Sequence, residues 1–354
     1  MLGQVAADEV ALSGILPVEK CPQRGHVDHR LHLACDWLLV TGIGHLIDNV
    51  IRGHAPQGNL ARVNRPEPET DLGRMRYNFS ILGVQKSGTS TLSGTISQHR
   101  LVCRPPRKEA HFFNDEEYDW AHPDYERDYT APRRAKVHTM VGDSTPVYLF
   151  WPNALERMRA YDPDLPLIAV FRDPIERLFS HWTMLRTRHP DWPDWPVFLT
   201  EFRPTSLPTS VPTDVKPMRY KHMSGIARGY YGAQLDRGFS VFDRSQWLLL
   251  EFRSMLSSFD ASVDRATDHL GLPRFDRHPP LRNRYAGASV VTGTAPSASD
   301  LVSLAQLYAA DLAVFDQLSG LDTSDWPTTR ILAGTLDPEE LAVKLATKVA
   351  PVSG

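Results

Sequence analysis

Three short stretches of the chain are mainly apolar, and each ends at a polar or glycine-rich turn. They span residues 77–84, 165–171 and 247–252. The stretch 165–171 is the strongest of the three because it is continuously apolar. An unbroken apolar run of this length is typical of a parallel strand that is covered on both faces of its sheet. A shorter run over 137–141 predicts one further strand.

Between these runs, apolar residues recur at helical spacing. The pattern predicts helices over 91–99, 153–161, 174–186, 260–270 and 299–318. Pro174 stands in the first turn of one of them, a position that proline favours. Strands that alternate with helices argue for a parallel sheet with helices on both faces. We therefore predict an α/β fold, a single P-loop-like domain with a central parallel sheet flanked by helices.

The pattern outside these elements divides the chain into three parts. They are an N-terminal extension over 1–76, the main domain over 77–330 and a C-terminal helical tail over 331–354. The extension combines an amphipathic helix within 31–51 with a linker over 54–74 that is rich in proline, glycine and charge. Inside the domain, the proline-rich stretch 192–217 predicts an irregular insert. Such an insert is either a functional lid or binding loop, or a solvated surface excursion.

Composition narrows the class of protein. The 354 residues carry a net charge of -3, which argues against a dominant nucleic-acid surface. The first residues lack the basic start and apolar core of a signal peptide, and charged residues interrupt the apolar stretch 31–51. Cys21, Cys35 and Cys103 fit neither a zinc site nor a disulfide framework. We expect a cytoplasmic protein with no membrane span, no nucleic-acid partner and no metal.

A glycine- and hydroxyl-rich turn joins the first predicted strand to the first predicted helix. It reads Gln85-Lys86-Ser87-Gly88-Thr89-Ser90-Thr91. Such a turn presents backbone N–H groups and the positive end of a helix dipole to an anion. The pattern is not a Walker A loop, in which the lysine follows the second glycine. The loop therefore predicts an anion site, and the alternative is a helix start that binds no ligand.

A second anion element follows the strongest strand. Arg172 stands at its carboxyl end, and Ser180 lies on the helix that comes next. Ligands of open parallel sheets bind outside the carboxyl ends of the strands, and guanidinium groups make paired hydrogen bonds to phosphate. Two anion elements at one sheet edge indicate a ligand with phosphates at two ends. The alternative for Arg172 is a surface ion pair with Asp173 or Glu176.

Taken together, these motifs resemble the family of sulfotransferases that use 3′-phosphoadenosine 5′-phosphosulfate (PAPS), most closely the heparan sulfate N- and O-sulfotransferase branch. The loop 85–91 is similar to the family's 5′-phosphosulfate loop. Residues 171–180, FRDPIERLFS, resemble the R-D-P-x-E-R-x-x-S element that grips the 3′-phosphate. Between them, 109–113 is similar to an E-x-H-F-F segment and 143–148 to a K-T-P-x-Y segment. The resemblance runs from about residue 77 to residue 326.

The resemblance implies direct in-line transfer from PAPS, without a metal, that leaves adenosine 3′,5′-bisphosphate. Lys86 would neutralise the leaving phosphate, an electrostatic role. Glu109 would be the base, and we expect burial to raise its pKa toward neutrality. The alternative for Glu109 is a surface or helix-capping carboxylate. His111 is the competing base, and its alternative is an imidazole packed beside Phe112.

The resemblance also suggests the remaining contacts. Donor contacts would come from the hydroxyls of the loop, from Arg172 and Ser180, and from residues later in the chain, namely Tyr231, Gly293 and Thr294. Two departures stand out: Ser144 replaces the lysine of K-T-P, and Gly293-Thr294 stands where relatives carry Lys-Gly. Arg282 or Arg284 are candidate substitutes for that lysine.

Tyr148, Arg186 and Arg188 are candidate walls of the acceptor pocket, although the arginines could equally be solvated surface residues. The predicted function is transfer of a sulfuryl group to a hydroxyl or amine of a carbohydrate, a glycosylated acceptor or a small molecule. Two rivals remain: an atypical P-loop kinase, and a non-catalytic nucleotide-binding protein of the same fold.

Overall fold

The structure is a computed structural model that describes residues 72–204, 206–281 and 290–351. The described residues all belong to one compact unit, Pro68–Gly354. The predicted helix within 31–51, most of the predicted linker, Cys21 and Cys35 lie outside the described residues. Cys103 is a buried free thiol.

The core of this unit is a five-stranded parallel sheet. Its order is β3 (Val102–Cys103), β5 (Met140–Asp143), β2 (Phe79–Gly83), β6 (Leu167–Phe171) and β7 (Trp247–Glu251). β2 is the first of these five strands along the chain and lies at the centre of the sheet. The chain continues from β2 to β3 and β5 on one side and then to β6 and β7 on the other, so the order of connection reverses beside β2. The predicted α/β fold is confirmed. Ligands of such sheets bind at the carboxyl edge, where this reversal opens a crevice.

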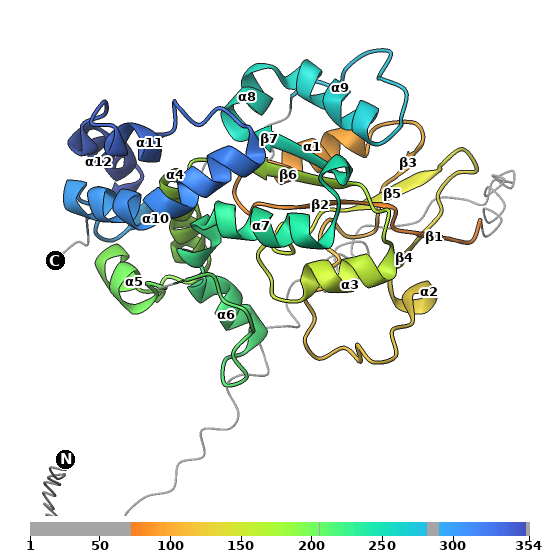
Figure 1. The fold of residues 1–354 in the computed structure, drawn as a ribbon, viewed down its shortest axis with the longest axis horizontal. Helices are drawn as coiled ribbons and strands as arrows, with labels where there is room; N and C mark the ends of the chain where they lie inside the picture. The colour runs from red at the N-terminus through yellow and green to blue at the C-terminus, as the bar shows by residue number, and fades with distance from the viewer. Residues whose placement is uncertain (1–71, 205, 282–289, 352–354) are drawn as a thin grey trace, which may run out of the picture. The chain divides into compact units, whose positions relative to one another are not determined.

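The strands are mainly apolar because helices cover both faces of the sheet. In β6, Leu167, Ala169 and Phe171 pack into one core cluster, and Ile168 and Val170 pack into another. The helices α1 (Thr89–Ile96), α8 (Phe252–Ser257) and α9 (Phe259–His269) cover one face; α3 (Ala154–Tyr161) and α7 (Tyr231–Val241) cover the other (Figure 1). Alternate side chains of the strand therefore pack on opposite faces of the sheet. Because both faces are apolar, the sequence shows no alternation of polar and apolar residues.

A third core cluster forms beside the sheet, around α4 (Pro174–Arg188) and α10 (Ala298–Ser319). The stretch 192–217 was predicted to be irregular throughout. It instead contains a helix, α5 (Trp195–Glu201). Trp195 and Phe198 stand three residues apart on this helix, face the same side and are fully buried in the cluster. The helix α6 (Pro217–Met223) begins where the insert ends.

The C-terminal residues are part of the same compact unit. α11 (Pro327–Leu332) and α12 (Pro338–Ala346) follow α10, and α12 buries Leu341 and Leu345 in the third cluster. β9 (Val349–Ala350) pairs with β8 (Val291–Thr292) in parallel. The remaining described elements are β1 (Arg74–Arg76), α2 (Tyr125–Asp128), β4 (Thr130–Pro132), η1 (Ala227–Gly229) and η2 (Arg244–Gln246).

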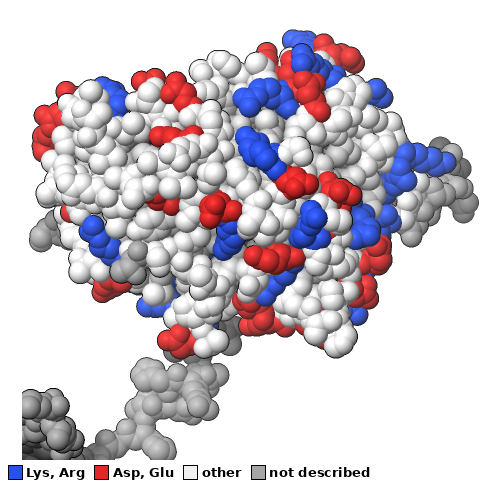
Figure 2. Space-filling model, in the orientation of Figure 1, with Lys and Arg blue, Asp and Glu red and all other residues white. Residues whose placement is uncertain are grey.

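Two surface properties bear on the sequence predictions. On the face shown in Figure 2, basic and acidic side chains are interspersed, without a large area of one sign. Among the described helices, α10 alone is long and apolar enough to cross a membrane, with a mean hydropathy of 1.2 over its most apolar window. Core helices of soluble proteins meet the same test, and α10 packs in a core cluster. The absence of a membrane span stays a prediction.

Candidate active site

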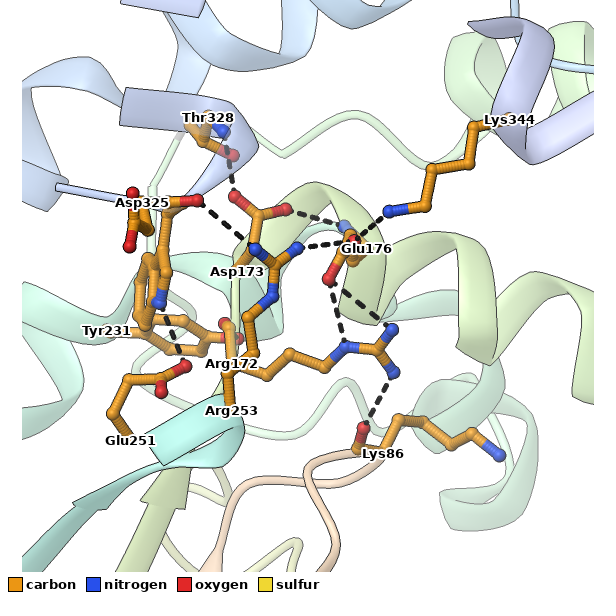
Figure 3. Close-up of polar contacts among 11 residues, drawn as sticks. Lys86, Arg172, Asp173, Glu176, Tyr231, Glu251, Arg253, Asp325, Thr328 and Lys344 are labelled. Carbon is orange, nitrogen blue, oxygen red and sulfur yellow. Dashed lines mark hydrogen bonds and ion pairs between the residues drawn. The ribbon is translucent and has the colours of Figure 1, made fainter. Parts of the chain in front are cut away.

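Three neighbouring strands deliver the candidate residues to one edge of the sheet. Lys86 follows β2, Arg172 follows β6, and Asp143 is the last residue of β5. Because β5, β2 and β6 are adjacent and parallel, their carboxyl ends lie side by side. Arg172 Nη1 donates a hydrogen bond of 3.4 Å to the carbonyl oxygen of Lys86 (Figure 3). The two predicted anion elements are therefore in contact.

The loop after β2 has the features of an anion cradle. Gly88 has φ 81°, and a Cβ there would stand 2.9 Å from atoms of Met255 and Phe252. No side chain among the described residues caps the start of α1, which leaves N–H groups of its first turn available. The Ser87 hydroxyl is fully buried and has no partner among the described residues. An unpartnered buried donor beside an open helix start fits an anionic group, because burying it alone costs free energy.

Lys86 carries the positive charge of this loop. Burial, and then the nearby charges of Arg188 and Arg172, lower its pKa to about 8. Its ammonium makes no hydrogen bond or ion pair with any described residue, and its side chain extends away from Arg172 (Figure 3). A bound anion would stabilise the protonated form of Lys86. The loop therefore holds a cation that lacks a counter-ion.

Arg172 belongs to a cluster of basic side chains around Glu176 (Figure 3). Arg172 Nε lies 3.5 Å from Glu176 Oε2, while Arg253 Nη2 and Lys344 Nζ lie 2.8 and 3.4 Å from Oε1. Burial raises the pKa of Glu176, but the three cations outweigh burial and lower it. Three positive charges against one negative charge leave a net positive site beside the loop. Ser180 lies one turn further along α4 and is half-buried.

Arg172 pairs with Glu176 and also contacts the loop, so the ion pair named as its alternative is present. The contact of Arg172 with a phosphate stays a prediction. The sequence pointed to neither Arg253, from α8, nor Lys344, from α12. Lone basic residues on helices carry no local pattern that distinguishes them from solvated ones.

Asp173 fixes the position of this cluster. Its carboxylate accepts hydrogen bonds from the backbone N–H groups of Glu176, at 2.7 Å, and Thr328, at 2.8 Å (Figure 3). The first bond caps α4, and the second ties α11 to the same point. Asp173 is fully buried, and burial raises its pKa although these hydrogen bonds lower it. It is a structural residue of the site.

The segment that carries Glu109 and His111 is held by the end of β5. Asp143 accepts hydrogen bonds from Tyr129 and Tyr148 hydroxyls at 2.9 and 2.8 Å and from the Ala110 N–H at 3.2 Å. The Thr145 hydroxyl donates to Asp143 at 2.6 Å and accepts from the His111 N–H at 3.3 Å. The segment that resembles K-T-P-x-Y thus sets the backbone around Glu109.

Glu109 sits among basic groups. Its Oε1 lies 2.8 Å from Lys108 Nζ, and its Oε2 lies 3.1 Å from His111 Nε2. Burial raises the pKa of Glu109, but hydrogen bonds with His111 and Lys108 and the charges of Lys108 and Lys221 bring it down to about 2. The expected rise toward neutrality is therefore wrong. Glu109 is ionised at neutral pH because neighbouring cations outweigh its partial burial.

Three predicted contact residues are committed elsewhere. Tyr148 and Tyr231 are fully buried, with hydroxyls that donate to Asp143 and to the Arg172 carbonyl at 2.8 and 2.9 Å. Both hydroxyls are engaged within the protein, and their predicted contacts with the acceptor and the nucleotide stay predictions. Arg186 donates to the carbonyl oxygens of Pro190, Trp192 and Thr292. It therefore holds the chain after α4, and its contact with the acceptor stays a prediction.

The remaining predicted residues lie further along the chain. Thr294 is exposed, and its N–H donates to Asp194; Gly293 is buried against the same carboxylate. Arg282 and Arg284 lie outside the described residues. Arg188 is exposed at the end of α4, and its charge lowers the pKa of both Lys86 and Lys221. Among the described residues, no cluster of three metal-ligating side chains occurs.

A polar network that no sequence motif predicts joins the two halves of the site. Gln85 Oε1 accepts hydrogen bonds from Arg228 Nη1 and lies 3.0 Å from His181 Nδ1. Arg228 also donates to the carbonyl of Lys221, whose ammonium lies 3.2 Å from His111 Nε2. The network therefore runs from the anion loop, through η1 and α6, to the segment of Glu109.

The fold of this chain is shared with a solved sulfotransferase. A solved sulfotransferase from Alicyclobacillus acidocaldarius superposes with a TM-score of 0.56 and 24% identity, over 71% of this chain and 99% of that one. The likeness shows the sulfotransferase fold. No protein-family model matches the chain.

Two curated proteins are similar to this chain in sequence. Human heparan sulfate glucosamine 3-O-sulfotransferase 3A1 is 30% identical over 227 residues, which cover 63% of this chain and 50% of that protein. Human heparan sulfate glucosamine 3-O-sulfotransferase 6 is 29% identical over 214 residues, which cover 58% and 56%. The chain spans about half the length of the curated relatives it matches. Over this region the chain is similar in sequence to heparan sulfate sulfotransferases, which confirms the resemblance seen in the sequence.

Proposed function

We propose that this chain is an enzyme that transfers a sulfuryl group from PAPS to a hydroxyl or amine of an acceptor. The observation that carries the proposal is the contact between Arg172 and the Lys86 loop. It joins two positively charged sites at the carboxyl edge of the sheet, and a donor with phosphates at two ends needs both. The family relationship supports the same donor.

The two sites fit the two ends of this donor. The Lys86 ammonium, the Ser87 hydroxyl and the open start of α1 would hold the 5′-phosphosulfate. Arg172 and Ser180 would hold the 3′-phosphate, and Arg253 and Lys344 would add positive charge there. PAPS supplies the sulfuryl group when it is bound. Lys86 would stabilise the negative charge that develops on the bridging phosphate oxygen.

The acceptor proton would go to the Glu109–His111 pair. Glu109 is ionised and its side chain is 35% exposed, so it can accept a proton from a ligand that approaches from solvent. Its low pKa makes an isolated Glu109 a weak base. The imidazole beside it at 3.1 Å supplies a second acceptor position within the same hydrogen-bonded unit.

A carbohydrate or glycosylated acceptor suits the charge around this pair. Arg188, Lys108 and Lys221 give the neighbourhood of Glu109 a positive surplus, which would favour an anionic sugar. The relatives named above act on glucosamine in heparan sulfate, which supports the same acceptor class. A small-molecule acceptor is the alternative.

A transfer assay with ³⁵S-labelled PAPS over a panel of sugars, phenols and amines tests the proposal. We expect label on at least one acceptor, without added metal, and a loss of about a hundredfold or more in rate for Lys86→Ala. Lys216→Ala, an exposed lysine before α6, is the matched control and should keep the wild-type rate.

Three outcomes would argue otherwise. Transfer from ATP that requires Mg²⁺ would favour a kinase. Binding of adenosine 3′,5′-bisphosphate without transfer to any acceptor would favour a non-catalytic nucleotide-binding protein. Neither transfer nor binding would overturn the proposed function.

A further inference from the structure

Lys221 is a basic residue at the centre of the site for which the proposed transfer has no role so far. It lies on α6, near the end of the helix, and is half-buried. Its Nζ lies 3.2 Å from His111 Nε2, the same nitrogen that lies 3.1 Å from Glu109 Oε2. One imidazole nitrogen therefore faces an ammonium and a carboxylate at once.

This arrangement forces a choice on His111. The other ring nitrogen, Nδ1, lies 2.9 Å from Asn114 Oδ1, an acceptor, so Nδ1 carries a proton. If His111 is neutral, Nε2 holds a lone pair, which accepts from the Lys221 ammonium. If His111 is protonated, Nε2 donates to Glu109, and two positive charges then lie side by side. Lys221 thus favours the neutral imidazole, and Glu109 favours the protonated one.

The backbone of Lys221 is fixed with respect to both halves of the site. Its carbonyl oxygen accepts hydrogen bonds from Arg228 Nη2 and from the Ser224 hydroxyl. Arg228 is buried and also donates to Gln85, which precedes Lys86 in the anion loop. The anchor of Lys221 is therefore shared with the loop that would hold the donor.

We propose that Lys221 is a positioning residue for the transfer, which holds the His111 ring beside Glu109 so that the Glu109 carboxylate is presented to the acceptor proton. The inference rests on the proposed function and adds a residue to its machinery. Several charged groups face Lys221: Lys108, Glu109 and His111 from the loop before β4, Arg188 from α4, Arg228 from η1, and His222 beside it on α6. Among them, Glu109 alone is acidic.

The surplus of cations has a consequence for Lys221 itself. Burial, and then the Arg228 charge, lower the pKa of Lys221 to about 8, although Glu109 raises it. Lys221 is therefore charged at pH 7 and loses its charge as the pH rises through about 8. An arginine at this position would stay charged over that range.

The ring resonance of His111 tests the proposal without any transfer. Protein with ¹³Cε1-labelled histidine is studied by NMR at pH 7, and the His111 resonance is assigned with His111→Asn. We expect Lys221→Met to move this resonance, because the ring loses its contact at 3.2 Å with the ammonium. Lys221→Arg should leave the resonance near its wild-type position, and Lys216→Met should leave it unchanged.

Kinetics and nucleotide binding complete the test at pH 7. Lys221→Met should lower kcat about tenfold or more. The Kd for adenosine 3′,5′-bisphosphate should stay within about threefold of wild type, and Lys221→Arg should recover most of the rate. An unchanged His111 resonance in folded Lys221→Met, or a loss of nucleotide binding in place of kcat, would overturn the role of Lys221. A wild-type protein that binds no bisphosphate would instead overturn the proposed function, and the NMR comparison would still decide whether Lys221 positions His111.

Discussion

Glu109 and Glu176 are each surrounded by three basic side chains, but the two clusters are built differently. Lys108, His111 and Lys221 surround Glu109; Arg172, Arg253 and Lys344 surround Glu176. The side chain of Glu109 is 35% exposed and that of Glu176 is 8% exposed. In both, neighbouring cations overcome burial and lower the pKa of the carboxyl.

The difference lies in where the partners come from. Glu176, on α4, takes its partners from the turn after β6, from α8 and from α12, and these partners cover its carboxylate. Glu109 takes two partners from its own segment and faces solvent on its open side. The number of neighbouring charges does not distinguish a structural counter-ion from a reactive carboxylate. The exposure of the carboxylate and the elements that supply its partners do distinguish the two.

The largest expected effect sharpens this contrast at Glu109. We predict that Glu109→Gln lowers the transfer rate about a thousandfold, because the unit loses the charge that draws the acceptor proton. Tm should change by less than about 3 °C, since the side chain is partly exposed. Steady-state kinetics and calorimetry on the same preparation measure both. A variant with near wild-type kcat would remove Glu109 from the mechanism.

Glu176 should behave in the opposite way. We predict that Glu176→Gln lowers the free energy of unfolding by about 2 kcal/mol, because charge-assisted hydrogen bonds to three cations are weakened. Affinity for adenosine 3′,5′-bisphosphate should stay within about threefold, since the cations that face the ligand remain. Denaturant unfolding and titration calorimetry make the comparison. Unchanged stability together with lost affinity would mean that Glu176 acts on the ligand and not on the fold.

A pH series probes the loop that lies between the two clusters. The pKa of Lys86 is about 8 in the free protein, and a bound phosphate would raise it. Affinity for the bisphosphate should therefore fall as the pH rises through 8, by about tenfold between pH 7 and pH 9, because binding must then take up a proton. Lys86→Arg should flatten this dependence, and Lys221→Arg should not. A slope that survives in Lys86→Arg would assign the titration to another group.

The smallest expected effect concerns Tyr231, which supports the backbone of Arg172 in the Glu176 cluster. Tyr231→Phe removes the hydroxyl that donates to the Arg172 carbonyl at 2.9 Å. We predict a loss of about 1 kcal/mol in stability and less than a threefold loss in bisphosphate affinity. Tyr230→Phe is the matched control, because its hydroxyl makes only a 3.5 Å contact with Pro204. A loss of affinity far larger than the loss of stability would support Tyr231 as a ligand contact.

The fold was predictable because its cause is local. Residues 79–83, 167–171 and 247–251 are mainly apolar since helices cover both faces of the sheet, and glycine and proline mark where strands end and helices begin. The helix α5 was missed because the prolines around it indicate a break. Pro196 stands in its first turn, where proline is tolerated, and burial of Trp195 and Phe198 stabilises the rest.

The site was predictable only where its residues lie next to strand ends. Lys86 and Arg172 follow adjacent strands, so their meeting follows from topology. Tyr148 and Arg186 were predicted to contact the acceptor because the sequence does not indicate whether a single tyrosine or arginine is buried or engaged within the protein. Lys221, Arg253 and Lys344 went unnoticed for the same reason, since each reaches the site from a helix with no motif.

The sequence by itself determined the sheet, the order of its motifs and the anion loop, because each depends on neighbours along the chain. Tertiary structure alone decided the charge state of Glu109, the use of Tyr231 as a support for Arg172, and the place of Lys221 beside His111. These properties depend on distances between side chains of different elements. Electrostatic interactions and burial are set by those distances, and no local pattern of residues records them.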